Sequence, residues 1–218
     1  MNALSRRRKI PTGNFPCFCP TRYVIMGKTE ESMTVFDFDK TIYKTDSTVA
    51  FWKYCIGRKK SLLLLLPKQG FYGVLYGLRL ISLTAFKEKF YCFLKHIDAE
   101  TWAEEFWAQA QQNIMPWTKD EIREGDWVVS ASPEFLLRPI AKKLNVNLLA
   151  SPVDPKTGTY HGENCKGEEK IRRLAEVGVT AWDKSFSDSL SDAPILSVAA
   201  EGYLVNNKKG TIVPFVKR

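Results

Sequence analysis

The sequence predicts an α/β fold in which a parallel sheet carries a long helical insertion. Two observations predict this fold. Short apolar runs that are typical of buried strands alternate with helical segments along most of the chain, as in parallel sheets. One segment, residues 46–120, interrupts the alternation because it has long apolar stretches but no clear strand pattern. A chain of 218 residues, 44% of them hydrophobic, can bury such a core.

The expected elements follow this alternation in order. Residues 33–38, M-T-V-F-D-F, and residues 127–132, W-V-V-S-A-S, are rich in β-branched and aromatic side chains and predict buried strands. Pro133, followed by Glu134, predicts the start of a helix of about ten residues. The other expected strands are residues 145–151, 185–188, 196–206 and 211–216, and a further helix is expected over residues 167–177.

Turn and cap signals set the expected boundaries. The sequence D-P-K-T-G from Asp154 predicts a hairpin-like flap over residues 152–164. Asp46, followed by Ser47, predicts the start of the first inserted helix. The expected parts of the chain are a basic, disordered N-terminal extension over residues 1–32, a core domain over 33–45 and 121–218, and a helical cap over 46–120.

The net charge of +8 is concentrated in two segments. Residues 1–32 hold six Lys or Arg against two Glu, and residues 51–90 hold eight against one Glu, so they carry +4 and +7. The rest of the chain is close to neutral. A nucleic-acid partner is not expected, because its binding groove would spread positive charge over the core. Residues 1–32 also lack the apolar run of a secretory signal.

The five cysteines are odd in number and scattered, and the chain has only two histidines. This pattern argues against a structural zinc site. Reduced thiols in the cytoplasm are the simplest interpretation.

Two carboxylates follow the first expected strand. Asp37 and Asp39 are two residues apart, so both can reach the same rim of the sheet if the chain bends there. Such a pair can supply a nucleophile and a general acid/base beside a hard cation. Acidic helix caps, a solvated loop, and the Asp-x-Asp metal site of glycosyl transfer are the other interpretations.

Three further polar clusters lie at expected strand ends or helix starts. Ser130 precedes a helix, where a hydroxyl and N–H groups can bind phosphate, although an ordinary N-cap explains a single serine equally well. Lys166 or Lys170 can neutralise a phosphoryl oxygen or can be a solvated surface lysine. Asp188 and Asp192 can form half of a magnesium site, or a cap and a surface acid. In this order, the clusters together indicate a phosphate-handling metal site.

These motifs resemble those of the haloacid dehalogenase (HAD) superfamily of phosphotransferases, close to its phosphoserine-phosphatase-like subfamily IB. The first motif is matched by D-F-D-K-T, the second by V-V-S, the third by the K-G-E-E-K region and the fourth by D-S-L-S-D. The match runs over roughly residues 33–218. The resemblance implies a Rossmann-like parallel sheet core with an inserted helical cap.

The resemblance also implies a magnesium-dependent phosphomonoester hydrolase. Asp37 would attack phosphorus and form an aspartyl-phosphate, and Asp39 would protonate the leaving oxygen and then activate water. The residues implied to hold Mg²⁺ are Asp37, Asp39 through its backbone carbonyl, Asp188 and Asp192. The residues implied to hold the phosphate are Thr41, Ser130 and a lysine, either Lys166 or Lys170, with Lys170 slightly favoured.

Three departures from the phosphoserine phosphatase pattern bear on the substrate. The chain has S-A-S where S-G-G is usual, S-D-S-L-S-D in place of G-D-G-x-x-D, and Asp46 at the position of a glutamate. The F-S-D-S-x-x-D form and the apolar insertion are more similar to the bacterial phosphatidylglycerophosphatase C family. A lipid phosphate such as phosphatidylglycerol phosphate is therefore the expected substrate, and a small soluble ester such as phosphoserine is the alternative.

The insertion contains apolar runs over residues 61–67 and 71–81, with Arg58, Lys59 and Lys60 before them. Both runs are too short to span a membrane, so we expect them to contact an anionic membrane surface from the cytoplasmic side. The alternative is an amphipathic cap that only packs on the core. A third hypothesis is a non-catalytic membrane-surface protein with this fold, which the presence of both Asp37 and Asp39 disfavours.

Overall fold

The computed structural model describes residues 32–207 and 209–216. Nearly all of the expected N-terminal extension, with Cys17 and Cys19, lies outside the described residues. The three remaining cysteines, Cys55, Cys92 and Cys165, are free thiols.

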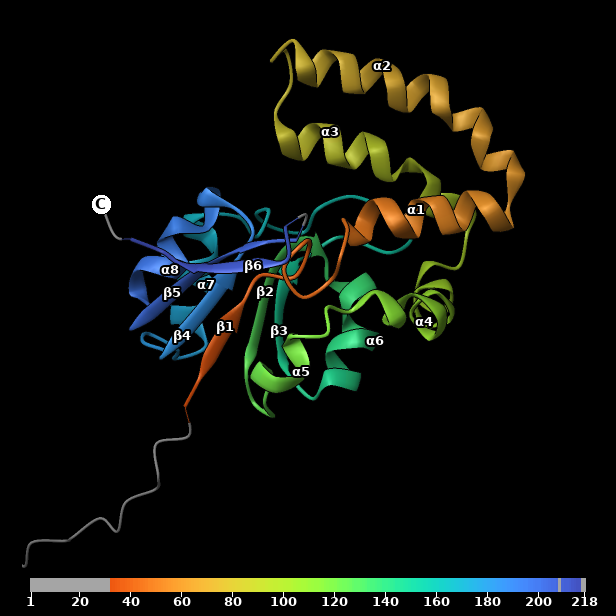
Figure 1. Ribbon diagram of the computed structural model, residues 1–218. Coiled ribbons are helices and arrows are strands. Elements are labelled where there is room, and N and C mark those ends of the chain that lie inside the picture. The colour runs from red at the N-terminus through yellow and green to blue at the C-terminus, as the bar shows by residue number, and fades with distance from the viewer. Residues whose placement is uncertain (1–31, 208, 217–218) are drawn as a thin grey trace, which may run out of the picture. The chain divides into compact units, whose positions relative to one another are not determined.

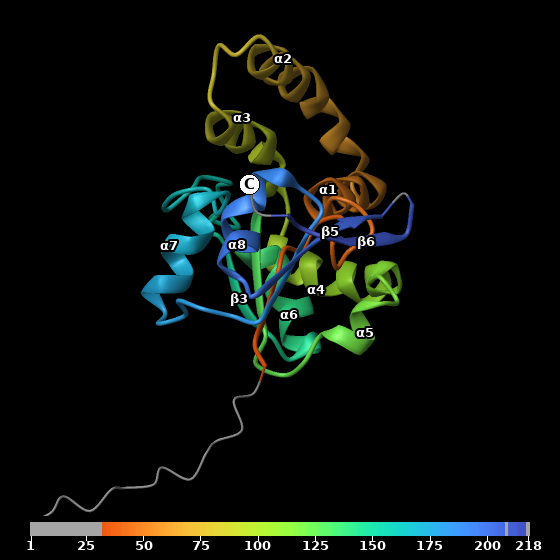
Figure 2. The same cartoon turned by 60° about the vertical axis from the view of Figure 1, so that its left-hand side comes forward.

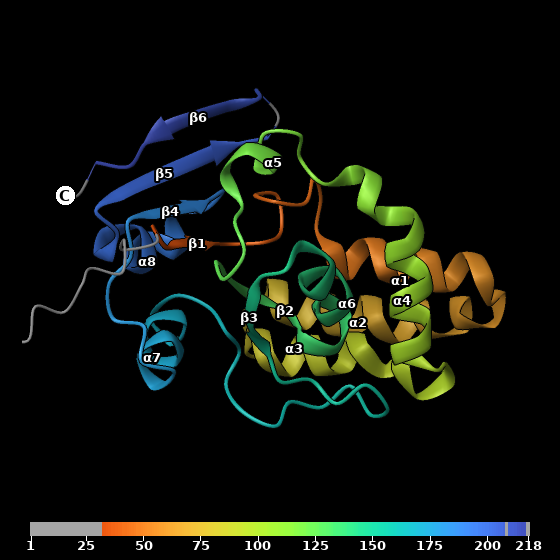
Figure 3. The same ribbon diagram turned by 90° about the horizontal axis from the view of Figure 1, so that it is seen from below.

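One six-stranded sheet organises the described part of the chain, in the order β3-β2-β1-β4-β5-β6 (Figures 1 and 3). Its first five strands are parallel, and β6 runs antiparallel to β5. The strands are β1 (Thr34–Phe36), β2 (Trp127–Pro133), β3 (Asn147–Ser151), β4 (Lys184–Ser187), β5 (Glu201–Asn206) and β6 (Thr211–Pro214). The α/β fold with a mostly parallel sheet is therefore confirmed.

Helices cover both faces of the sheet (Figure 2). Adjacent strand residues alternate between two apolar clusters: Val128 and Phe36 belong to one, and Val129 and Val35 to the other. The helices of the core are α6 (Glu134–Leu144), α7 (Glu168–Glu176) and α8 (Ala193–Val198), with the short 3₁₀ helix η4 (Leu190–Asp192) before α8. Helix α6 packs on β2 and β3, whereas α8 packs on β4 and β5.

One expectation about the C-terminal region was wrong in detail. The expected strand over 196–206 begins only at Glu201, because α8 occupies the preceding residues. Pro194 stands in the first turn of α8, and Ile195, Leu196 and Ala199 are buried at helical spacing. The last strand is antiparallel because only a short turn separates it from β5, and a parallel connection needs a longer crossover.

The segment between β1 and β2 is entirely helical or irregular, as expected. Its helices are α1 (Ser47–Arg58), η1 (Lys60–Leu65), α2 (Leu66–Gly77), α3 (Leu83–Phe90), η2 (Tyr91–His96), α4 (Ala99–Ala110), η3 (Gln111–Asn113) and α5 (Thr118–Glu121). Asp46 caps α1, as expected, by accepting a hydrogen bond from the Val49 amide at 2.9 Å. Of the helices in the described ranges, none is both long and apolar enough to cross a membrane.

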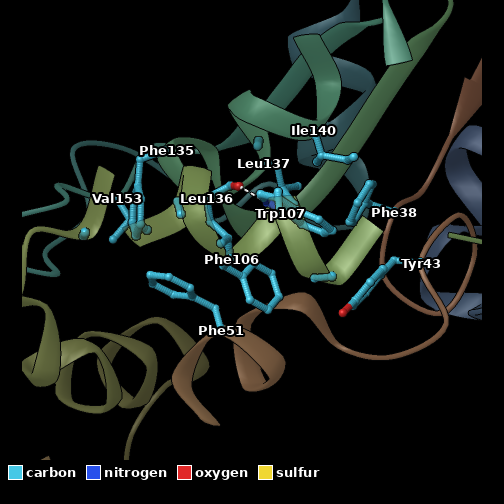
Figure 4. Packing of buried hydrophobic residues seen from close by; sticks show 14 of the residues in the cluster. Phe38, Tyr43, Phe51, Phe106, Trp107, Phe135, Leu136, Leu137, Ile140 and Val153 are labelled. Carbon is cyan, nitrogen blue, oxygen red and sulfur yellow. Dashed lines mark hydrogen bonds between the residues drawn. The ribbon is translucent and has the colours of Figure 1, made fainter. Parts of the chain in front are cut away.

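The insertion shares its apolar core with the sheet layer (Figure 4). Phe51 of α1 packs edge-on against Phe106 of α4 and Phe135 of α6. The indole Nε1 of Trp107 donates a 2.6 Å hydrogen bond to the Leu136 carbonyl oxygen. These contacts attach α1 and α4 to the sheet layer, and α1 contributes Thr48 and Val49 to the lining of the site described next.

Candidate active site

The carboxyl ends of the three central strands bring the expected site residues to one edge of the sheet. Strand β1 lies between β2 and β4, so residues that follow these strands converge. Asp37 comes directly after β1, and its amide donates to the Phe186 carbonyl oxygen of β4 at 2.9 Å. Ser130 is buried within β2, and Asp188 comes directly after β4. Ser130 does not cap α6, since the cap position is Pro133.

A tight turn after β1 brings Asp39 back to the same edge. Lys40 adopts the left-handed conformation with φ of 60°, which reverses the chain between Asp39 and Thr41. The Ser47 amide donates to Asp39 Oδ1 at 2.6 Å, and the Ser132 hydroxyl donates to Oδ2. Both oxygens of the Asp39 carboxylate are thus held, one from α1 and one from β2.

Lys170 on α7 is the lysine that contacts Asp37. Its Nζ lies 2.7 Å from Asp37 Oδ1 and 2.8 Å from Asp192 Oδ2, and the side chain is almost fully buried. Lys166 also lines the site, but it precedes α7 and makes no described ion pair. The geometry therefore favours Lys170 over Lys166 as the lysine beside the first carboxylate.

Burial governs the ionisation of these groups. Burial would lower the pKa of Lys170, but the carboxylates of Asp37 and Asp192 outweigh it and raise that pKa. The lysine therefore remains a cation. Burial raises the pKa of Asp37 to about 7, even though Lys170 opposes the shift.

Loss of solvent also raises the pKa of Asp39, to about 6. The charge of Asp46 adds to this shift, and the hydrogen bonds from Ser132 and Ser47 oppose it. A carboxyl group with a pKa near neutrality can both donate and accept a proton. Asp39 is thus suited to acid/base chemistry.

Two expected site residues contact and position other side chains of the site. Asp192 Oδ2 accepts hydrogen bonds from both Lys170 and the Ser187 hydroxyl, which fixes the lysine. Thr41 is fully buried, and its hydroxyl donates to Asp37 Oδ2 at 3.3 Å. Thr41 does not line the cavity, so its position suits orienting Asp37 rather than holding phosphate.

These residues surround a cavity of about 370 Å³, a size that suits a small-molecule site. Its polar wall includes Asp37, Asp39, Ser130, Lys170, Asp188 and Asp192. The insertion contributes the apolar part of the lining, Val49, Leu83, Phe86, Phe90 and Tyr91, together with the polar Asp46, Thr48 and Lys87. The cavity thus combines charged and apolar lining.

The structure adds Lys87 of α3 to the site, a residue that sequence reasoning counted only among the basic residues of the insertion. Its Nζ donates to the Ala131 carbonyl oxygen at 2.8 Å and to Asn164 Oδ1 at 3.0 Å. Burial lowers the pKa of Lys87 to about 8. The only sequence signal was a lysine within an apolar helix, which is common on helix surfaces.

The donor set of the cavity consists of hard oxygen atoms. Across the described residues, no three His, Cys, Asp or Glu side chains gather closely enough to enclose a metal ion. Mg²⁺ does not require such a cluster, because it usually keeps several waters and binds one or two carboxylates together with a phosphate. Asp37 and Asp188, with the Asp39 carbonyl, therefore fit Mg²⁺ by their chemistry.

The chain is similar to several known proteins. The chain is 29% identical over 203 residues to protein CicA of Caulobacter vibrioides, covering 81% of this chain and 87% of the relative. A solved protein of unknown function from Bordetella pertussis Tohama I superposes with a TM-score of 0.65 at 21% identity, covering 80% of this chain and 89% of that one.

A probable phosphoserine phosphatase from Vibrio cholerae superposes with a TM-score of 0.53 at 14% identity, covering 78% of this chain and 55% of that one. These structural likenesses confirm the fold. The sequence model of the haloacid dehalogenase-like hydrolases matches residues 34–197, a segment that contains every expected site residue. The chain belongs to the haloacid dehalogenase-like hydrolase family.

Proposed function

We propose that this protein is a phosphomonoester hydrolase that forms an aspartyl-phosphate at Asp37. The observation that carries the proposal is the contact between Lys170 Nζ and Asp37 Oδ1 at 2.7 Å, in a cavity that also exposes Asp39. A carboxylate that attacks an anionic phosphoryl group needs a nearby cation to cancel repulsion. A buried lysine with a raised pKa supplies it.

The two carboxylates divide the chemistry between them. The Asp37 carboxylate forms a bond to phosphorus while the bond to the ester oxygen breaks, and protonated Asp39 gives its proton to that oxygen. Asp39 then takes a proton from water as the water attacks phosphorus, which breaks the bond to Asp37 and releases inorganic phosphate. Ser130 and Lys170 hold the phosphoryl oxygens during both steps.

The charge of the cavity is consistent with a divalent cation. Five aspartates and four lysines line the cavity, so a bound phosphate dianion would leave an excess of negative charge. Asp37, the Asp39 carbonyl and Asp188 would hold Mg²⁺, with Asp192 supporting the site through Lys170. When bound, Mg²⁺ supplies a Lewis acid for the phosphoryl oxygens.

The apolar wall of the cavity favours a lipid phosphate as the substrate. Leu83, Phe86 and Phe90 lie on successive turns of α3, and all three line the cavity. Such a wall suits the glycerol and acyl part of a molecule such as phosphatidylglycerol phosphate. The phosphate would lie at the opposite, charged end.

A specific pair of charges favours a second candidate, a small soluble ester such as phosphoserine. Lys87 and Asp46 line the same cavity as the phosphate-handling residues. A cation and a carboxylate there could pair with the carboxylate and ammonium of an amino acid. The solved Vibrio cholerae protein that shares this fold is a probable phosphoserine phosphatase.

Phosphate release from a panel of esters separates the two candidates. The panel contains phosphatidylglycerol phosphate in detergent micelles, phosphoserine, and p-nitrophenyl phosphate, each with added Mg²⁺ and with EDTA. We expect the lipid phosphate to have the highest kcat/KM and EDTA to abolish turnover. A preference for phosphoserine would favour the second candidate.

The variant Asp37→Asn tests the chemistry itself. Asparagine has the same shape and can still accept the Lys170 hydrogen bond, but it cannot attack phosphorus. We expect activity to fall by at least about a thousandfold. Asp120→Asn, at an exposed carboxylate, is the matched control and keeps full activity. Full activity in Asp37→Asn would contradict the proposal.

A further inference from the structure

Helix α2 has one face that packs on α3 and one face without a partner among the described residues. On the inner face, Gln69 Nε2 donates to the Phe90 carbonyl oxygen at 2.8 Å, and Tyr76 stacks on Phe86 with ring centroids 5.2 Å apart. In Figures 1 and 2, α2 is the outermost helix of the insertion, and α3 lies between it and the strands.

The outer side of α2 is apolar. Phe71, Val74 and Leu78 recur at spacings of three and four, which places them on one side of the helix, opposite Gln69 and Tyr76. They are 59%, 61% and 64% exposed. Leu64 before the helix and Leu80 after it are 82% and 67% exposed, so the chain on either side of the helix also presents apolar side chains to solvent. We call these five residues the α2 apolar face.

Basic residues precede, interrupt and follow this face along the chain. Lys59, Lys60, Lys68 and Arg79 are all exposed, and residues 59–81 contain no Asp or Glu. An exposed apolar surface of this extent marks an interaction site. The charge narrows the choice of partner, because a second copy of this chain would bring four positive charges against four others.

We propose that the α2 apolar face and its basic rim bind the surface of an anionic phospholipid membrane. A helix of twelve residues cannot cross the bilayer but can lie in the interface with its apolar side toward the acyl chains. The lysines and the arginine then lie among the lipid phosphates, where each basic residue contributes about 1 kcal/mol.

The helix pair α2 and α3 connects the α2 apolar face to the active site. Helix α3 packs on α2 on one side and contributes Leu83, Phe86, Lys87 and Phe90 to the cavity on another. Binding through α2 therefore holds the apolar wall of the cavity near the lipid surface. This link to catalysis rests on the proposed function, whereas the binding itself does not.

Vesicle sedimentation tests the surface without any substrate. Purified protein is mixed with vesicles of phosphatidylcholine alone or of phosphatidylcholine with phosphatidylglycerol. We expect wild-type protein to sediment with the anionic vesicles and to be released by high salt. The double variant Phe71→Ser/Val74→Ser should bind at least tenfold more weakly. Each charge removed in Lys60→Gln/Lys68→Gln should weaken binding about fivefold.

Control measurements separate a specific effect of the α2 apolar face from a general effect on the surface or on folding. Val213→Ser/Val216→Ser removes two exposed valines at the C-terminal end of the described chain and should bind vesicles like wild type. Circular dichroism and hydrolysis of p-nitrophenyl phosphate should be unchanged in all variants, because none of these residues lines the cavity. Equal binding of wild type and Phe71→Ser/Val74→Ser, or no binding by wild type, overturns the proposal.

Sedimentation of the protein without vesicles tests the other possible occupant of this face, a second copy of the chain. If wild type is a dimer that Phe71→Ser/Val74→Ser converts to a monomer, the face joins two copies of the chain and the membrane proposal is wrong. A failure of vesicle binding leaves Asp37-dependent phosphate release untouched. A failure of phosphate release likewise leaves the vesicle result standing, so the two proposals can fail separately.

Discussion

The hydroxyl of Ser132 donates a hydrogen bond to Oδ2 of Asp39, a carboxylate 93 residues earlier in the chain. Ser132 Oγ in turn lies 3.1 Å from the Ser47 hydroxyl and 3.0 Å from that of Thr48. One serine of β2 therefore links the proposed general acid/base to the start of α1. Ser132 also lines the cavity, and through these contacts it would position Asp39.

Ser132→Ala should slow the reaction in a way that depends on the leaving group. Alkyl esters need a proton from Asp39 as the oxygen leaves, whereas p-nitrophenolate leaves without one. We expect the rate of leaving-group release in a single turnover to fall about tenfold or more for an alkyl phosphate and less than about twofold for p-nitrophenyl phosphate, because the later attack of water needs Asp39 with either ester. Ser197→Ala, at an exposed serine of α8, is the control. Equal losses on both esters would show a merely structural role.

Lys170→Met should remove activity on every ester. Methionine keeps much of the side-chain volume but leaves Asp37 and Asp192 without the cation that both contact. Removing one partner of a buried ion pair costs about 3–5 kcal/mol, so the variant should also unfold at lower denaturant concentration. Lys142→Met, at an exposed lysine of α6, should be unaffected in both assays. Retained activity would exclude Lys170 from the phosphate site.

Gly158→Ala should destabilise the protein. Gly158 has φ of 75°, and an added Cβ would lie 2.6 Å from Tyr91 Cβ and 2.7 Å from the Tyr91 carbonyl oxygen. The flap over residues 152–164 would have to move away from η2, at a cost of about 1–3 kcal/mol. Thermal unfolding measures the loss. Gly57→Ala in α1 is the control, because open space surrounds it and alanine favours a helix.

Glu169→Gln should change the acid stability of the protein. Glu169 contacts Arg172 and Arg173 at 2.6 and 2.7 Å, and its pKa falls to about 2 from 4.5. Since the folded-state pKa is the lower one, this stabilisation is present above about pH 4.5 and is lost as the pH falls toward 2.

The variant should therefore be about 1 kcal/mol less stable than wild type near pH 7. That difference should shrink below about pH 4.5. Urea unfolding of both proteins at several pH values measures it. Glu176→Gln, which removes an exposed partner of Arg172, should have a smaller effect. A difference that does not change with pH would contradict the assignment.

Much of the fold followed from local signals. The β-branched and aromatic residues before Asp37 indicated a buried strand, and Asp46 marked the start of α1 by its capping chemistry. The prediction of a strand over 196–206 was wrong at its first residues. Apolar residues such as Ile195 and Leu196 could be buried by a helix as well as by a strand. Short apolar runs do not distinguish these two states.

The sequence by itself determined the α/β class, the helical insertion and the set of acids and lysines that converge on one sheet edge. It could do so because local sequence patterns mark where each strand ends and in which order the strands follow along the chain. Only the tertiary structure decided that Lys170, rather than Lys166, contacts Asp37, that Lys87 joins the site, and that Ser132 of the second polar cluster contacts Asp39. Those contacts join residues up to 133 positions apart, and the tertiary placement of β2, α3 and α7 sets them.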